Sequence, residues 1–505
     1  MRNVTGPQPD PRAQLWRCAL LVLLAFPLPG LALWLAGRRR AGAAALAATA
    51  AAVLTLAVLW GQHRPEQLAV RLGSRPDLLE SAALVVVALG TAWLSAIVGT
   101  ASAAWPATAT RGEKLGAMTL VVALSLAVAG PTALVARYAL ISRALATQVF
   151  ASGVGVRADG LQVPEPRRQP HVDPWAGTPR LNVLLLGLDS AAGRVGVRPD
   201  SIVLASVDTR TGATVLFGLP RNLEKVPFPR SSPLHRLWPH GFDCGSECLL
   251  NAVWTEAVNH AGLFPGDPSP GLTATRSAVE AVLGLPVDYT VTVSLRGFME
   301  LVDAVGGVEV NVRTTLPIGG AHDGAGRVTE APRGYIEPGR QHLDGYHALW
   351  FSRSRFASND FDRMRRQRCM IGALVAQVDP MTFLARFPAI AAATGRNLHT
   401  DIPLSDLPAW ATIAERVRAG SLTSLPLTDA VVHPDRPDFN RIRTLVRAAL
   451  AIRPGPAAAT APTSGTASSS PPPSTRQGPS TAQRPTVRPP GHQRATAPQR
   501  LADAC

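Results

Sequence analysis

The residues best suited to chemistry in this chain are arginines gathered in one short segment. Positions 353–367 read RSRFASNDFDRMRRQ, which places five arginines, two aspartates and one glutamine within fifteen residues. Guanidinium groups are planar, permanently charged and carry donors in a fixed fork, so a converging set of them suits a phosphate or pyrophosphate group. A solvated basic helix face is the ordinary alternative. Matching acidic and basic groups elsewhere in the chain favour the anion site.

The spacing predicts how these side chains are presented. In the second half of the segment, apolar residues recur with the helical period, which predicts a helix with one half-buried face. Arg363, Arg366 and Gln367 stand at i, i+3 and i+4 on that helix, so we expect them to converge on one side. Arg353 and Arg355 are expected on an extended segment, where alternate residues point the same way.

Two aspartates lie near the ends of neighbouring predicted strands. Asp189 ends the run NVLLLGLD, and Asp200 directly precedes the run SIVLASVD. Carboxylates at adjacent strand ends can share one divalent cation, and oxygen ligands suit magnesium. Arg198 stands at the same edge, and Arg221 follows Pro220 at the exit of the third strand. Basic groups beside two carboxylates indicate a cation and a polyphosphate held together, in preference to a turn residue and a local cap.

Alternating strands and helices surround these positions. Strands are expected at 182–187, 201–208, 213–220, 287–295 and 307–312, with a hairpin turn TRTG between the second and the third. Helices are expected at 247–262, 273–284, 296–306 and 343–350. This alternation predicts the α/β class, with a central mixed sheet and helices on both sides.

The first 140 residues carry four apolar stretches: Leu15–Gly37, Ala41–Gly61, Ser81–Trp105 and Ala117–Leu140. Each approaches the roughly 20 residues that cross a bilayer, and a cleavable signal peptide would not explain four of them. We therefore expect a tail at 1–14 and an all-α transmembrane region of up to four helices at 15–140. Arginine clusters in the short loops leave the orientation open.

The remaining chain divides by composition. Residues 141–180 are expected to form a linker, and 181–429 a globular domain. Residues 430–453 could end that domain. Residues 454–505 are rich in Pro, Ser, Thr and Ala, which predicts a disordered tail because such a segment buries too little apolar surface to fold.

The net charge limits the classes of binding partner, and the cysteines bear on possible disulfide and metal sites. The net charge of +15 rests on arginine, and it favours an anionic membrane surface or an anionic substrate. No zinc-finger, basic-zipper or RNA-recognition signature occurs, so we expect no nucleic-acid partner. Cys244 and Cys248 are close enough in sequence to bridge in an oxidising compartment, or they remain thiols; a zinc site would need a second pair. Cys505 is a lone thiol on the tail.

Taken together, the motifs resemble the LytR–CpsA–Psr family of cell-envelope proteins. The matching blocks are, in order, LLLGLD with RPD, GLPRN, VDYTVTVSLRGFMELVDAVGGVEVNV, and LDGYHALWFSRSR followed by DFDRMRRQ. The resemblance covers about residues 181–378. It implies a membrane-anchored, extracytoplasmic phosphotransferase that moves a glycopolymer from polyprenyl pyrophosphate onto peptidoglycan. The fold it implies is a three-layer α/β/α sandwich with an apolar pocket for the prenyl chain.

The resemblance also assigns residues to the site. The metal carboxylates match Asp189 and Asp200, which would hold Mg²⁺ or Mn²⁺, and Asp200 is a candidate general base. Beside the residues that the resemblance assigns, we expect Asp360 and Arg366 to take part in substrate binding. The assigned catalytic residues are Arg198, Arg221, Arg353, Arg355, Arg363 and Gln367. The expected partners are a polyprenyl-pyrophosphate-linked glycan, peptidoglycan and the lipid membrane.

Two departures from the family pattern leave alternatives open. Asn222 stands where the family has an aspartate, and Pro199 replaces a small residue, stiffening the backbone and removing a donor. A pyrophosphatase that releases the lipid carrier to water, or a non-catalytic lipid-binding regulator, would fit a weakened site. Teichoic acid, capsule and arabinogalactan all stay open as the polymer, and the Arg-, Ala- and Pro-rich composition favours an actinobacterial one.

Overall fold

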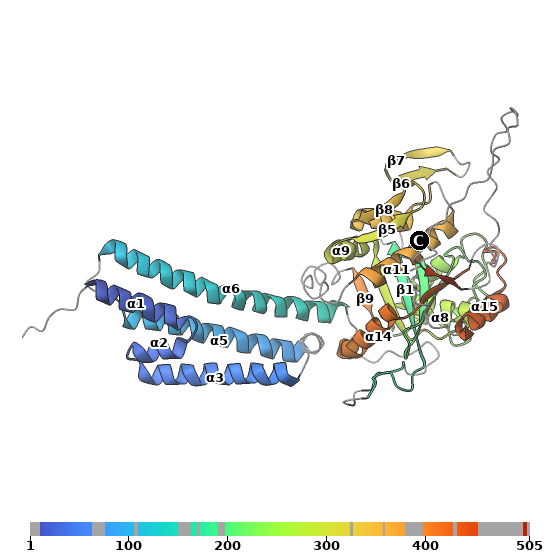
Figure 1. Ribbon diagram of the computed structural model, residues 1–505. Helices are drawn as coiled ribbons and strands as arrows, with labels where there is room; N and C mark the ends of the chain where they lie inside the picture. The colour runs from blue at the N-terminus through green and yellow to red at the C-terminus, as the bar shows by residue number, and fades with distance from the viewer. Residues whose placement is uncertain are drawn as a thin grey trace, which may run out of the picture. The chain divides into compact units, whose positions relative to one another are not determined.

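The structure is a computed structural model of the 505-residue chain (Figure 1). It describes residues 11–62, 76–105, 110–149, 163–167, 169, 172–189, 197–323, 327–356, 359–378, 397–427, 432–452 and 498–501. These residues form two compact units, which are described separately. The first unit comprises Met1–Gly155, Arg296–Gly306 and Val378–Thr412, and the second unit the rest.

The first unit is mainly helical. Its helices are α1 (Pro11–Ala25), α2 (Pro29–Leu35), α3 (Arg39–Gln62), α5 (Pro76–Ala103), α6 (Arg111–Val149) and most of α9 (Leu295–Val305), and it also holds η4 (Leu404–Asp406) and strand β9 (Leu398–Thr400). Among the described residues, two helical segments are long and apolar enough to cross a membrane, Glu80–Ala103 and Arg111–Arg137. They overlap the third and fourth predicted stretches, and each begins before the stretch that it matches.

Two predictions for the amino-terminal region are wrong. The stretch Leu15–Gly37 is not one helix, because α1 ends at Ala25 and α2 begins at Pro29, a residue that lacks the N–H needed inside a helix. The predicted linker does not begin at residue 141, because α6 continues to Val149.

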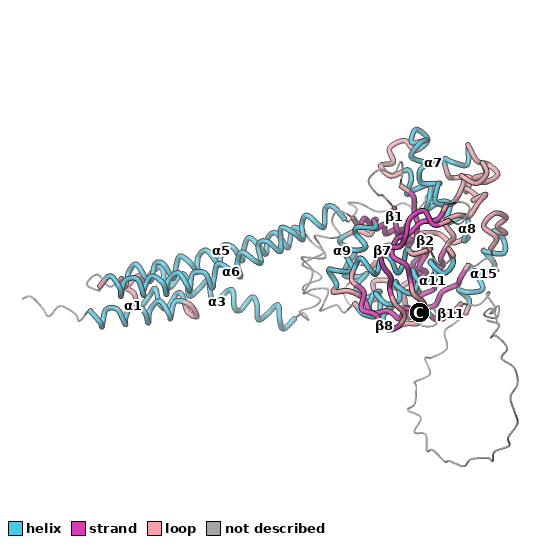
Figure 2. The backbone as a smooth tube through the Cα atoms, turned by 90° about the horizontal axis from the view of Figure 1, so that it is seen from above, coloured by secondary structure: helices cyan, strands magenta, loops and turns pink. Residues whose placement is uncertain are grey.

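A mixed β-sheet forms the centre of the second unit (Figure 2). Its strands are β1 (Arg180–Asp189), β2 (Arg198–Asp208), β3 (Thr214–Gly218), β4 (Tyr289–Ser294), β10 (Leu422–Pro426) and β11 (Gln499–Arg500). They lie in the order β11-β10-β3-β2-β1-β4. The pairs β1–β2, β2–β3 and β10–β11 are antiparallel, whereas β1–β4 and β3–β10 are parallel. The predicted mixed sheet is confirmed.

The helices of this unit connect and cover the sheet. They are η1 (Pro233–Arg236), η2 (Leu250–Ala252), α7 (Val253–Asn259), η3 (Ala261–Leu263), α8 (Pro270–Leu283), α10 (Gly345–Arg353), α11 (Asp360–Gln377), α14 (Leu407–Ala419, which begins in the first unit) and α15 (Phe439–Ala451). Gly284 ends α8 in the left-handed conformation, at the predicted end of this helix. The helix predicted from residue 247 is shorter than expected, because regular helix starts only with η2 and α7.

Two small antiparallel sheets complete the second unit. Strand β5 (Val308–Val312) pairs with β8 (Gly339–Leu343), and β6 (Leu316–His322) pairs with β7 (Val328–Ile336). The strand predicted at 307–312 is therefore present, but its partner is β8 and not a strand of the central sheet. Strand pairing over such a separation is not visible in hydrophobic periodicity.

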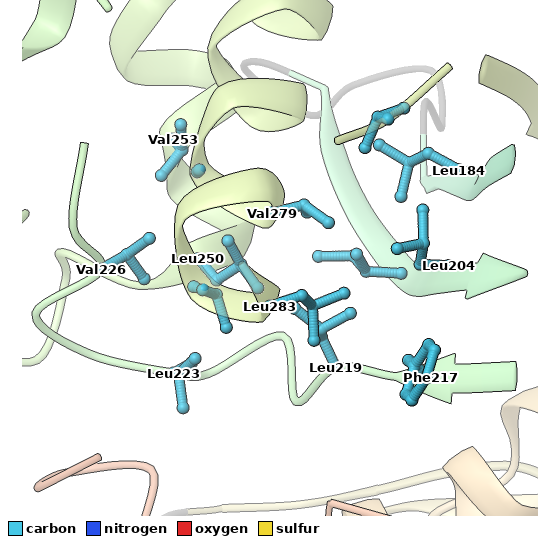
Figure 3. Close-up of a cluster of buried hydrophobic side chains, with 14 of the residues drawn as sticks. Leu184, Leu204, Phe217, Leu219, Leu223, Val226, Leu250, Val253, Val279 and Leu283 are labelled. Carbon is cyan, nitrogen blue, oxygen red and sulfur yellow. The ribbon is translucent and has the colours of Figure 1, made fainter. Parts of the chain in front are cut away.

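Both faces of the central strands are buried in apolar clusters. On one face, Leu204, Phe217 and Val279 belong to a cluster that joins the sheet to α8 (Figure 3). The same cluster includes residues of α15. On the other face, the alternate residues Val203 and Leu216 pack with Ile371 of α11. Burial on both faces explains why these strands read as continuous apolar runs without polar alternation.

The carboxyl-terminal part of the chain adds to this core. Helix α15 contributes Ile442 and Val446, so the segment whose assignment was open at 430–453 belongs to the domain. The end of the predicted tail is not wholly disordered, because Gln499–Arg500 form β11 and Leu501 is buried. Residues 453–497 and 502–505, including Cys505, lie outside the described residues.

Disulfides resolve the open question about the cysteines. Cys244 and Cys248 are joined, with their Cα atoms 5.3 Å apart. Cys369 on α11 is also disulfide-bonded, whereas Cys18 is free.

The core makes a testable prediction. Leu204→Ala removes a fully buried side chain from the cluster beneath α8 and should lower the free energy of unfolding by about 2–5 kcal/mol. Val258→Ala, at an exposed position of α7, should change it by less than about 0.5 kcal/mol. Denaturant titration of the full-length protein in detergent, followed by tryptophan fluorescence, measures both. Equal effects would contradict this core.

Candidate functional site

The paired ends of β1 and β2 position the acidic side chains of the site. Asp189 is the last residue of β1 and lies opposite Arg198, the first residue of β2. Gly187 faces Ser201 but Leu188 faces Pro199, so the register shifts and Asp200 is an additional residue in β2. Such a bulge redirects side chains at the end of a strand.

Asp189 forms an ion pair with the segment that the sequence singled out. Its side chain is only 2% exposed, and Arg353 Nη2 donates to its Oδ2 at 3.0 Å. An ionised carboxylate at such depth requires a compensating charge. This pair therefore joins the end of β1 to the end of α10, across 164 residues of sequence.

Asp200 binds the arginine that leaves β3. Arg221 Nη1 donates to Asp200 Oδ1, and the Arg221 carbonyl accepts a hydrogen bond from the Asn251 N–H at 3.0 Å. The backbone and the side chain of Arg221 are therefore both held. Asn222, which departs from the family pattern, is exposed. The carboxylate partner of Arg221 is therefore Asp200 of β2 and not a side chain at position 222.

Asp360, the first residue of α11, lies among three guanidinium groups. Arg363 Nη2 is 3.0 Å from Asp360 Oδ2, while Arg221 Nε and Arg355 Nη1 are 3.7 and 3.8 Å from Oδ1. Asn359 Oδ1 accepts the Asp362 N–H at 2.8 Å and caps this helix. The capped helix start thus brings three arginines from separate segments to one carboxylate.

Arg363 is the most deeply buried arginine of this group. Its side chain is 3% exposed, and Nη2 also donates to the Asp200 carbonyl at 3.3 Å. Burial lowers the pKa of Arg363 to about 10, while Asp360 acts in the opposite direction. Burial, and then the nearby charge of Arg221, also lower the pKa of Arg355. Arg363 nevertheless keeps its charge at neutral pH.

Gln367 and Arg366 lie on different sides of α11. Gln367 Oε1 accepts a hydrogen bond from Ser201 Oγ at 3.2 Å, so Gln367 faces β2 together with Arg363. Arg366 instead donates from Nε to the Phe351 carbonyl at 2.8 Å and from Nη2 to the Ser354 carbonyl. The expected convergence of all three is wrong. Arg366 fastens α11 to α10, and its role in substrate binding stays a prediction.

The segment with Arg353 and Arg355 differs from the extended one that was expected. Arg353 is the last residue of α10, and Arg355 follows in the irregular connection to α11. Asp344 caps the start of α10, because its Oδ1 accepts the His347 N–H at 2.8 Å. Arg353 and Arg355 thereby reach different carboxylates, Asp189 and Asp360.

Arg198 stands apart from the ion pairs of the site. It is exposed at the start of β2, and it forms no ion pair within the described part of the chain. Its position opposite Asp189 keeps it at the same strand edge. Its predicted role stays a prediction.

Two polar residues near the site were missed in the sequence. Ser201 orients Gln367, and Arg368 is buried beside Gly218 at the end of β3. Burial lowers the pKa of Arg368 to about 10. The absent side chain of Gly218 leaves room for the guanidinium, since Arg368 Nη1 lies 3.1 Å from where a Cβ would stand. The helical period could have indicated Arg368, four residues after the apolar Met364.

The arrangement suits an anion that carries several negative charges. Arg221, Arg353, Arg355 and Arg363 contact three carboxylates, which leaves an excess of positive charge even before the nearby Arg198 is counted. Guanidinium groups held in place by carboxylates lose little freedom when an anion binds. The site is therefore organised for a phosphate or diphosphate group.

A divalent cation would have two carboxylate ligands here. Among the described residues, no group of three or more His, Cys, Asp or Glu side chains could hold a metal. Mg²⁺ commonly binds through one or two carboxylates, with water and substrate phosphates as further ligands. In this structure Asp189 binds Arg353 and Asp200 binds Arg221, so a cation held by the two carboxylates together with a diphosphate stays a prediction.

Comparison with known proteins identifies the family. Residues 162–433 match the model of the LytR_cpsA_psr family, which is more than half of the chain. The chain belongs to the LytR–CpsA–Psr family. The match begins before the predicted domain start at residue 181, in agreement with the burial of Val163 and Trp175.

Curated relatives are named as transferases. The chain is 25% identical over 293 residues to the polyisoprenyl-teichoic acid–peptidoglycan teichoic acid transferase TagV of Bacillus subtilis, covering 55% of this chain and 67% of that protein. It is 29% identical over 230 residues to TagU of Enterococcus faecalis, covering 45% and 63%. The crystal structure of B. subtilis TagV aligns with a TM-score of 0.38 at 22% identity, covering 55% of this chain and 98% of that one.

The site predicts selective loss of anion binding. Arg363→Ala removes the buried guanidinium at the start of α11 and should weaken pyrophosphate binding at least about tenfold. Arg340→Ala removes a guanidinium that is 82% exposed on β8, and it should leave the affinity within about twofold. Isothermal titration of the full-length protein with inorganic pyrophosphate distinguishes them. If the wild-type protein and both variants bound pyrophosphate with equal affinity, Arg363 would not be part of the anion site.

Proposed function

We propose that this protein transfers a glycopolymer from a polyprenyl-pyrophosphate carrier to peptidoglycan during cell-wall assembly. The observation that carries this proposal is the gathering of Arg221, Arg353, Arg355 and Arg363 around carboxylates at the ends of β1 and β2. Membership of the family and the names of the curated relatives support the same reaction class. Because the chain spans about two thirds of these relatives, its polymer and acceptor are part of the proposal.

The reaction needs charge stabilisation more than acid catalysis. A hydroxyl oxygen of the acceptor forms a bond to the glycan-side phosphorus, the bond to the bridging oxygen breaks, and polyprenyl phosphate leaves as a stable anion. The arginines would hold the phosphate oxygens and stabilise the charge that shifts onto the bridging oxygen. Arg363 is particularly suited to this role, because burial strengthens its interaction with a bound anion.

Two aspartates have proposed roles beside the arginines. Asp189 and Asp200 would bind Mg²⁺ or Mn²⁺, which would supply further positive charge next to the diphosphate. The Asp200 carboxylate is also a candidate acceptor for the proton of the incoming hydroxyl. Asp360 is better suited to positioning than to contact with the substrate, because a carboxylate repels phosphate oxygens while it orders three arginines.

The proposal includes the cellular location of the protein and the layered arrangement of its second unit. The Cys244–Cys248 disulfide and two helices long enough to span a bilayer support a membrane protein with its second unit outside the cytoplasm. Buried clusters on both faces of the sheet support the three-layer α/β/α arrangement. Several membrane passes and an apolar site for the prenyl chain complete the proposal.

Transfer can be tested directly with the full-length protein in detergent. Lipid-linked glycopolymer, peptidoglycan and Mg²⁺ should yield polymer attached to the wall fraction. Arg221→Ala should lower the rate by about 10²–10³-fold, since it removes a fixed donor from the developing charge, whereas Arg340→Ala should retain it. Release of lipid phosphate without attached polymer would indicate a pyrophosphatase, and full activity of Arg221→Ala would refute the site.

The exposed position of Asn222 allows a second test. Asn222→Asp should change the transfer rate by less than about threefold, because Arg221 already has Asp200 as its partner. Rates with saturating lipid-linked polymer measure the effect. An inactive wild-type protein that binds the lipid and is activated by Asn222→Asp would establish the regulator alternative instead.

A further inference from the structure

Helix α10 presents a row of side chains that ends in the arginine cluster. Tyr346, Trp350 and Arg353 stand at i, i+4 and i+7 and so line one face of the helix. The ring centroids of Tyr346 and Trp350 lie 6.4 Å apart, and Arg353 Cζ lies 5.9 Å from the Trp350 ring centroid. Arg353 in turn binds Asp189. The aromatic row is therefore continuous with the proposed diphosphate site.

The aromatic row is accessible to a ligand. Tyr346 is 44% exposed and Trp350 is half-buried, whereas Ala348, Leu349 and Phe351 take the buried face of the same helix. Aromatic rings present large apolar faces together with polar edges. Two exposed aromatic rings that are neighbours on a helix, next to a charged site, indicate a surface that binds an extended ligand.

We propose that Tyr346 and Trp350 bind the sugar ring next to the diphosphate, an inference that rests on the function proposed above. The apolar C–H face of a pyranose packs against an aromatic ring, and its hydroxyls remain free to meet polar groups such as the Tyr346 hydroxyl. The glycan is bonded to the diphosphate that the arginines would hold. Its first sugars must therefore lie within reach of Arg353, where the row begins.

Two lipid probes test this sugar site. The full-length protein in nanodiscs should bind a polyprenyl diphosphate that carries one N-acetylhexosamine about three- to tenfold more tightly than the same lipid without sugar. Trp350→Ala should abolish this difference and leave the affinity for the sugar-free lipid unchanged. Tyr335→Ala, at an exposed aromatic position on β7, should keep the difference.

The outcomes separate this inference from the proposed function. The sugar site would be overturned if the wild-type protein bound the two lipids with equal affinity. It would also be overturned if Trp350→Ala lowered the affinity for both lipids equally, as expected if the aromatic row binds a protein partner instead. Wild-type transfer of polymer in the same preparation would leave the proposed function standing. Absence of transfer together with a sugar-dependent affinity that Trp350→Ala removes would overturn only the proposed function.

Discussion

The structure of this site depends on pairing arginines with carboxylates at the boundary between protein and solvent. Asp189 and Arg363 are almost fully buried, and charges at that depth are tolerated only with partners. Each ion pair joins two different elements. One joins β1 to α10, one joins β2 to the residue after β3, and one joins α11 to that same residue, Arg221. The ion pairs therefore fix where the ends of the strands meet the helices, and the same groups create the anion site.

This dependence explains which parts of the site the sequence could predict. The arginine-rich segment, the aspartates at the strand ends and the mixed sheet were all visible, because residue type and hydrophobic period report them directly. The contacts that each arginine makes were not visible in the sequence. Helical spacing placed Arg366 beside Arg363, but the carbonyls of α10 take its donors. The bulge at Asp200 depends on strand register, which a single sequence does not show.

The ends of the domain show a similar limit. Composition predicted a disordered tail after residue 453, but composition is averaged over a window and overlooked three residues near its end. Gln499 and Arg500 extend the sheet, and Leu501 fills space under α11. In the amino-terminal region, Pro29 divides an apolar stretch whose average hydropathy suggested one spanning helix. Single residues decide such boundaries, and averages hide them.

The central claim is that guanidinium groups from distant segments bind one diphosphate together. A double-mutant cycle on pyrophosphate affinity tests it most directly, using Arg221→Ala, Arg353→Ala and the double variant of the full-length protein. We expect a coupling energy above about 0.5 kcal/mol, because both arginines contact the same ligand. Strictly additive losses, or no loss in either single variant, would show that the two arginines serve separate sites and would contradict the account.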